Sequence, residues 1–204
     1  MSDNGKRTDR RIVRSRTALR QALLTLMADK PFTAISITEI VELADYNRGT
    51  FYSNYESKEA LLDDIMSDLI EKLLLSFRVP YEKVEFFHVD QLQAHSVKLF
   101  EHIYEHSSVY TVFMKSDMLM VLWGKMFAAI KNILKEELVY TKTDIDEELL
   151  QIYSIHALLG LVFHWIESGY KHSPAYMREQ LVKIINYHPT TAKTSVNRAN
   201  HNSQ

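Results

Sequence analysis

The chain has 204 residues, 46% of them hydrophobic, with five glycines and four prolines, which is typical of an ordinary globular protein with long helices. It contains no cysteine, which excludes disulfides, thiolate zinc sites, cysteine nucleophiles and iron–sulfur clusters. The formal net charge of −2 hides an asymmetry: residues 1–20 carry seven basic and two acidic side chains, whereas residues 57–204 carry fifteen and nineteen. Such a basic leading end suits a polyanionic partner, although a solvated tail without a partner would have the same composition.

The N-terminus is polar and basic and lacks an apolar signal segment, so we do not expect secretion. The longest apolar run, residues 155–166, is too short to span a bilayer and contains His156, Gly160 and His164. We therefore expect a soluble cytoplasmic protein.

The first helix is predicted over residues 10–29, after a leader, residues 1–9, that we expect to be disordered. It ends before Pro31, because proline cannot continue the backbone hydrogen-bond ladder. The next helix begins at Ser36, and Glu39 three positions later completes a capping box.

A polar break at residues 45–47 separates this second helix from a third. Asn47 is a typical N-cap for a helix over residues 48–55, and Ser57 is one for a long helix over residues 58–77. Two short helices joined by so tight a break indicate a helix-turn-helix, in which the second helix enters the major groove of DNA.

The remaining chain predicts five further helices, and we find no alternating strand pattern or internal repeat. These helices cover residues 89–106, 109–115, 118–139, 146–170 and 174–187. The predicted fold is all-α with about nine helices. It divides into a DNA-binding domain with a disordered basic arm (1–57), a connecting helix (58–79), a larger C-terminal helical domain (80–187) and a disordered tail (188–204).

The third predicted helix opens with residues suited to DNA. Arg48 is long enough to contact a guanine edge through two hydrogen bonds, or alternatively a phosphate. Gly49 lacks a Cβ and so allows close approach of the backbone to the duplex. Thr50 and Tyr52 carry hydroxyls suited to phosphate oxygens, and Lys58 at a helix start combines a cation with free backbone amides. The alternative is a compact helical corner with a solvated polar face.

These residues belong to a longer pattern, Ala44-Asp45-Tyr46-Asn47-Arg48-Gly49-Thr50-Phe51-Tyr52, followed by Tyr55, Lys58, Glu59, Leu61 and Leu62. The pattern resembles the N-terminal domain of tetracycline-repressor (TetR-type) regulators. The Asn-Arg-Gly-Thr-Phe-Tyr version and the leading Arg-Thr-Asp-Arg-Arg are most similar to a branch common in low-GC Gram-positive bacteria. Residues 157–169 are similar to the penultimate helix of that branch.

The resemblance implies a homodimeric, ligand-controlled transcription factor, usually a repressor. It implies phosphate contacts for Thr38 and Lys58 and a groove-facing position for Arg48, Thr50, Tyr52 and Asn54. With these six we count Asn47 and Gly49 as DNA-binding residues. Tyr46 and Asn54 depart from the residues most frequent in the family, which leaves the operator sequence open.

The half of the chain after residue 80 is expected to hold a small-molecule effector, whose chemistry does not follow from the sequence. The candidate pocket residues are six aromatic side chains, together with two histidines and a glycine that are spaced by four along the helix at 146–170. They are Phe100, Tyr104, Tyr110, Phe113, Trp123, Phe127, His156, Gly160 and His164. Ordinary core or interface packing is the common alternative for such a set.

The helices at 146–170 and 174–187 are strongly apolar and favour the two halves of an intersubunit four-helix bundle. The alternative is that both pack inside one subunit. A twofold dimer would place its two DNA-contacting helices about 34–36 Å apart, or a multiple of this, which predicts a palindromic operator.

The strongest enzyme hypothesis is a metal hydrolase, because His102, Glu105 and His106 match an H-x-x-E-H zinc motif. Such short patterns arise easily in a chain with nine histidines, and no G-x-S-x-G or Walker loop is present. A third hypothesis keeps the fold but makes the protein a coregulator that does not bind DNA. We expect a non-enzymatic regulator that needs no cofactor or metal and binds an operator duplex, a second copy of itself and an unidentified effector.

Overall fold

The computed structural model describes residues 3–138, 144–187 and 191, and of residues 3–9 only the backbone. This part of the chain is all-helical, with nine α-helices, three short 3₁₀ turns and no strand. The elements are α1 (Asp3–Asp29), η1 (Phe32–Ala34), α2 (Ile37–Leu43), α3 (Arg48–Tyr52), α4 (Lys58–Arg78), η2 (Val89–Gln91), η3 (Ala94–Ser96), α5 (Leu99–Glu105), α6 (Ser107–Lys115), α7 (Leu119–Glu137), α8 (Glu147–Glu167) and α9 (Pro174–Ile185).

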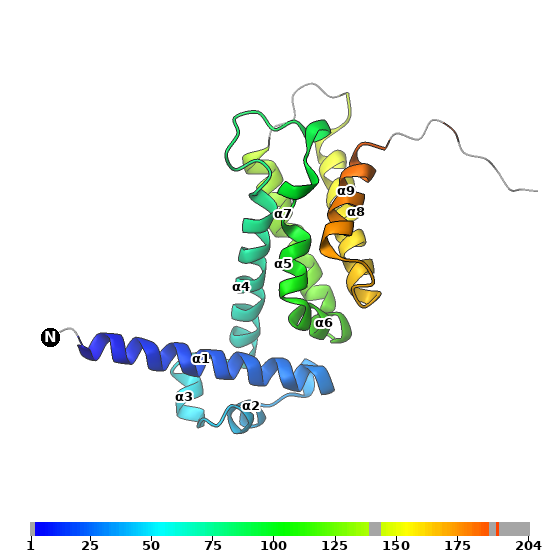
Figure 1. The fold of residues 1–204 in the computed structure, drawn as a ribbon. Coiled ribbons are helices and arrows are strands. Elements are labelled where there is room, and N and C mark those ends of the chain that lie inside the picture. Colours follow the sequence, from blue (N-terminus) through cyan, green and yellow to red (C-terminus); the bar gives the residue numbers. More distant parts are fainter. Residues whose placement is uncertain (1–2, 139–143, 188–190, 192–204) are drawn as a thin grey trace, which may run out of the picture.

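Helix α1 lies across one end of a bundle that is formed by α4 to α9 (Figure 1). Helices α2 and α3 lie on the side of α1 away from the bundle, and α4 rises from the opposite side (Figure 1). We call α1–α3 with η1 the head and α5–α9 the body. Helix α1 packs against α2, α4 and α6, so the head and body share one continuous hydrophobic core.

Four helix starts follow the predicted capping residues. The side chains of Ser36, Asn47, Ser57 and Ser173 each accept a hydrogen bond from a backbone amide in the first turn of the helix that follows. At α2 the capping box is complete. The caps at Ser36 and Asn47 fix the starts of the two helices of the helix-turn-helix.

Helix α1 begins earlier than predicted. It already includes residues 3–9, for which the sequence predicts disorder. Adding turns to an existing helix avoids the cost of nucleation, so the helix extends towards the N-terminus. Except for Thr191, the predicted disordered tail lies outside the described residues.

The helix predicted over residues 89–106 is wrong in its first half. The chain forms η2 and η3 there, and α5 begins only at Leu99. Leu92 and Val97 are the apolar residues that pack into the core, and their spacing of five does not match a helical face. The segment instead crosses to α9, which η3 contacts.

Helix α8 is, among the described residues, the one helix long and apolar enough by length and composition to cross a membrane. The shorter apolar run at 155–166 is part of it. Its inward side, including Ile155, Leu159 and Val162, is buried in the shared core, where α8 packs against α6 and α7. This packing is that of the core helix of a globular domain.

Candidate nucleic-acid interface

The turn between α2 and α3 is a compact backbone motif. The amide of Tyr46 donates to Val41 O at 2.9 Å and that of Asp45 donates to Glu42 O at 3.2 Å. Asp45 has φ = 57°, in the left-handed region where glycine is usual and aspartate is tolerated. The polar break predicted from the sequence is present, and this geometry ends α2 within one residue so that α3 starts in a new direction.

Helix α3 is anchored at its start and along one face. Asn47 Oδ1 accepts a hydrogen bond from the amide of Thr50 at 2.8 Å. The Phe51 side chain is completely buried and packs against Tyr55, with 6.1 Å between the ring centroids. One face of this short helix therefore packs into the core of the head through Phe51, and the opposite face is exposed to solvent.

The free face of α3 carries three of the predicted DNA-contacting residues. Arg48 and Gly49 are exposed, and Tyr52 is 52% exposed although its ring meets Phe51 edge-on. A Cβ at Gly49 would lie 3.2 Å from Asn47 Oδ1, so a larger residue would crowd the cap. Arg48 has no side-chain partner among the described residues, which leaves its guanidinium available.

Thr38 and Thr50 lie beside this face on the two helices of the motif. Thr38 in the first turn of α2 is exposed, and Thr50 is half-buried on α3. Both positions are compatible with the predicted phosphate and groove contacts, which stay predictions.

Lys58 is occupied within the head. Its Nζ donates to Phe32 O at 3.0 Å, Thr33 O at 3.2 Å and Ile35 O at 2.7 Å. It also lies 4.7 Å from the centre of the Phe32 ring. All three ammonium protons are thus used by η1 and the residue after it, so a phosphate contact would require breaking at least one of these bonds.

Asn54 is also engaged inside the head. Its amide donates to Thr50 O at 2.8 Å and to Ser15 Oγ on α1 at 3.2 Å. Ser15 is buried. This geometry favours fastening the end of α3 to α1 over the groove contact that the resemblance implied.

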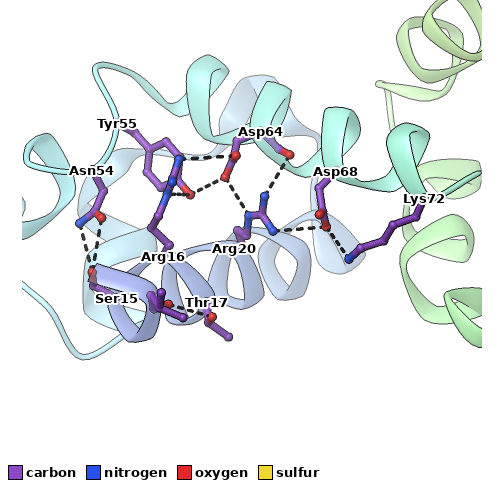
Figure 2. A network of polar contacts seen from close by, with 10 residues as sticks. Ser15, Arg16, Thr17, Arg20, Asn54, Tyr55, Asp64, Asp68 and Lys72 are labelled. Carbon is purple, nitrogen blue, oxygen red and sulfur yellow. Dashed lines mark hydrogen bonds and ion pairs between the residues drawn. The ribbon is translucent and has the colours of Figure 1, made fainter. Parts of the chain in front are cut away.

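A polar network joins α1 to α4 (Figure 2). Asp64 Oδ2 accepts hydrogen bonds from Arg20 Nε at 2.8 Å and from the Tyr55 hydroxyl at 2.6 Å. Arg16 Nε donates to the same hydroxyl at 3.2 Å, and Arg20 also reaches Asp68 at 3.4 Å. Burial opposes ionisation of Asp64, but the bonds from Arg20 and Tyr55 outweigh it and lower the pKa of its carboxyl. Nothing in the local sequence pattern indicates this network, because its members are far apart in the chain.

The body contacts the head directly through Asp117, in the turn between α6 and α7. Its carboxylate accepts from Phe32 N at 2.8 Å and from Thr33 N at 3.4 Å and Thr33 Oγ1 at 3.3 Å. Desolvation opposes the charge, but these bonds prevail and lower the pKa of Asp117. Asp117 could not be identified from the sequence, because a short polar turn between two helices gives no hint of a distant partner.

Two ion pairs join α4 to α7, one near the start of α4 and one at its end. Lys125 Nζ lies 2.6 Å from Asp63 Oδ1 near the head, and Arg78 NH2 lies 2.6 Å from Glu137 Oε1 at the far end of α4. The body is thus joined to η1 of the head through Asp117 and to α4 through these two ion pairs.

The residues predicted to line an effector pocket fall into three environments. Phe100, Tyr110 and Phe113 are buried core. Trp123 and Phe127 on α7 are half-buried against α8: the Trp123 and Phe163 rings are 4.6 Å apart, and those of Phe127 and His156 are 4.9 Å apart. The exposed members are Tyr104, His156, Gly160 and His164. The structure does not bring these nine residues together, and the effector site stays a prediction.

A cleft of about 320 Å³ lies between α8 and α9. Of the predicted pocket residues only His164 lines it, beside Trp165 and Ser168 from α8 and Tyr176 and Gln180 from α9. The cleft lies on the face formed by the two helices that we expect to dimerise.

The H-x-x-E-H motif has a packing role. His102 is buried, and its Nε2 lies 3.1 Å from the Tyr110 hydroxyl, while His106 Nδ1 lies 3.0 Å from His102 O. Desolvation, assisted by His106, lowers the pKa of His102 to about 4. In the part of the chain that the structure describes, no three histidine or carboxylate side chains are grouped to hold a metal ion.

Two family models match the chain and together cover most of it. Residues 19–65 match the model described as bacterial regulatory proteins of the tetR family, and residues 90–187 match the model described as a transcriptional regulator C-terminal region. The two matches coincide with the helix-turn-helix and with the body.

Known proteins similar to this chain include a curated relative and two solved structures. An uncharacterized HTH-type transcriptional regulator of Bacillus subtilis strain 168, YxbF, is 20% identical over 167 residues, 82% of this chain; the chain spans only 43% of that relative's length. A TetR transcriptional regulator from Streptococcus agalactiae 2603V shares the fold with a TM-score of 0.60, at 21% identity over 89% of this chain and 98% of that one.

The second solved structure is Thermus thermophilus FadR, a TetR-family transcriptional repressor in complex with lauroyl-CoA. It matches with a TM-score of 0.52, at 20% identity over 88% of this chain and 98% of its own. The capped and exposed α3, the all-helical body and both family models lead to one conclusion: the chain belongs to the TetR family of DNA-binding transcriptional regulators.

Proposed function

We propose that this protein is a cytoplasmic transcriptional repressor that binds a palindromic operator as a homodimer and leaves it when a small molecule binds the body. The observation that carries the proposal is the free face of α3. Arg48, Gly49 and Tyr52 are exposed on a helix that Asn47 and Phe51 hold in place. A rigidly held helix with a free guanidinium suits contacts to base edges in the major groove.

An exposed stripe on α8 and α9 supports dimerisation. On α8, Leu149 is 64% and Tyr153 is 74% exposed, and the small residues Ala157 and Gly160 continue the stripe. On α9, Ile184 is 55% exposed. Large apolar side chains in contact with water, next to small residues that permit close approach, favour burial against a second copy.

The contacts between body and head support control by an effector. The Asp117 contact joins the body directly to η1 of the head, and the two ion pairs join the body to α4, the helix that follows the helix-turn-helix. An effector that binds more tightly to one arrangement of body and head would shift the protein towards it, and by no more than that difference in affinity. Thermus thermophilus FadR, a repressor of the same fold bound to lauroyl-CoA, provides a precedent.

The experiment is selection of duplexes from a random library by the full-length protein, followed by binding measurements with the enriched sequence. We expect a palindrome, bound with a steep salt dependence because phosphate contacts release counterions. In cells, removing the protein should raise transcription from a promoter that contains this sequence. If no duplex is enriched, or the enriched sequence lacks twofold symmetry, the proposal fails.

The variant Arg48→Ala tests the assigned contact. It should reduce discrimination among substituted operators by about 1–3 kcal/mol at the base pair that Arg48 contacts, while binding to unrelated duplexes changes much less. Lys135→Ala, an exposed cation on α7, is the matched control and should leave discrimination unchanged. An equal loss on every duplex would contradict base contact by Arg48.

A further inference from the structure

The arginines of α1 fall into two groups by what they contact. Arg16 and Arg20 form ion pairs with carboxylates of α4. Arg10, Arg11 and Arg14 are exposed, and among the described residues none of them forms an ion pair or side-chain hydrogen bond. One group therefore joins α1 to α4, and the other forms no ion pair among the described residues.

The two groups also point in different directions. At about 100° per residue, Arg11 and Arg14 lie on roughly the opposite side of α1 from Arg16 and Arg20. Since Arg16 and Arg20 contact α4, the unused pair lies on the side away from α4. Figure 1 shows α2 and α3 on that side of α1. Arg11 lies four residues before Ser15, whose hydroxyl contacts Asn54 just after the end of α3, so Arg11 is on that face of α1, one turn nearer the N-terminus.

The unused pair lies beyond the helix-turn-helix along α1. The hydrogen bond between Ser15 and Asn54 marks where α1 passes the end of α3. From there α1 continues back to Asp3, and its first turns project past α3 in Figure 1. The helix from Asp3 to Arg14 has twelve residues and spans roughly 18 Å. Over this length one DNA strand presents about five phosphates.

We propose that the N-terminal half of α1 is a second DNA-contacting surface, in which Arg11 and Arg14 bind backbone phosphates outside the half-site occupied by α3. This inference rests on the proposed function and extends it to the flanks of the operator. Duplex DNA is the occupant that matches unpaired cations next to the contact of α1 with the end of α3. Contacts to phosphates carry no base preference, so this surface adds affinity and register without changing the sequence recognised.

The test compares two duplexes and two double variants of the full-length protein. One duplex contains only the palindrome selected by the wild-type protein, and the other carries about ten further base pairs, roughly one helical turn, at each end. Arg11→Gln with Arg14→Gln removes the proposed contacts, and both side chains are exposed, so folding should be unaffected. Lys83→Gln with Lys135→Gln removes the same charge from exposed positions outside the head. Binding is measured over a series of salt concentrations.

On the extended duplex, the arginine variant should bind roughly tenfold or more weakly, and the magnitude of its salt slope should fall by about 3 to 4, as expected for about four phosphate contacts per dimer. On the short duplex it should match the wild type, and the lysine variant should match it on both. Unchanged binding to the extended duplex would overturn the inference and point to another occupant. An equal loss on both duplexes would overturn the flanking position. If the wild type bound neither duplex, the proposed function itself would have failed.

Discussion

At the scale of single residues, the surroundings of a side chain decide between roles that the sequence leaves open. Lys58 lies at a helix start, where the resemblance implied a phosphate contact, yet its ammonium holds three carbonyls around η1. Asn54 similarly bonds to α1. Arg48 and Tyr52 are exposed, which is compatible with the predicted DNA contacts. The sequence identifies the helix-turn-helix reliably, but it cannot show which of its polar residues are already engaged.

His102 should make stability depend on pH. Its pKa is lowered to about 4 by burial, whereas an unfolded histidine has a pKa near 6.5. Between these values the unfolded state binds the proton and the folded state does not, so stability falls as pH falls from about 6.5 towards 4. The loss should reach on the order of 3 kcal/mol, since a tenfold difference in proton affinity between the two states corresponds to about 1.4 kcal/mol. Urea denaturation at several pH values measures it.

His102→Gln keeps a polar group near Tyr110 but cannot titrate, so it should flatten this part of the pH profile. His88→Gln, in the exposed segment before η2, is the control and should leave the profile unchanged. If His102→Gln retained the full pH dependence, the buried histidine would not be its source.

At the scale of elements, the polar turn between α6 and α7 fastens the head to the body. Asp117→Ala removes the acceptor for the Phe32 and Thr33 amides. We expect faster hydrogen exchange at these two amides and a loss of about 1 kcal/mol of stability, because the turn is exposed and water replaces the lost bonds. Hydrogen-exchange mass spectrometry and urea denaturation provide the measurements. Asp90→Ala, also exposed, should change neither, and unaltered exchange in Asp117→Ala would show that the contact does not order η1.

Elements whose boundaries depend on local chemistry were predictable from the sequence. The caps at Ser36 and Asn47 each involve residues only three positions apart, and both are present in the structure. The first half of the segment at 89–106 was not predictable, because Leu92 and Val97 pack into the shared core and η3 contacts α9, which is far away in the chain. The predicted pocket residues do not line one cavity, because aromatic side chains suit a packed core as well as a cavity and the sequence does not distinguish the two.

At the scale of the whole molecule, Gly160 tests the proposed dimer. It is exposed on α8, and a Cβ there would meet no atom within 4 Å in its own protomer. Gly160→Arg should raise the dissociation constant of the dimer at least about tenfold, because the twofold axis places two unpaired charges in the interface. Light scattering at micromolar concentration should then detect monomers, and operator binding should weaken in parallel. Gly160→Ala, which adds only a methyl group, should remain dimeric; dimeric Gly160→Arg would place the interface elsewhere.

The continuous core has a consequence for engineering hybrid regulators. Leu19, Leu23 and Phe51 belong to the same buried cluster as Leu61 and Ile65 of α4. A chimera that joined residues 1–57 to the body of another regulator would lack α4, whose apolar side chains complete this core. The smallest portion worth transplanting therefore includes α4, and the recipient must supply a carboxylate where Asp117 now meets η1.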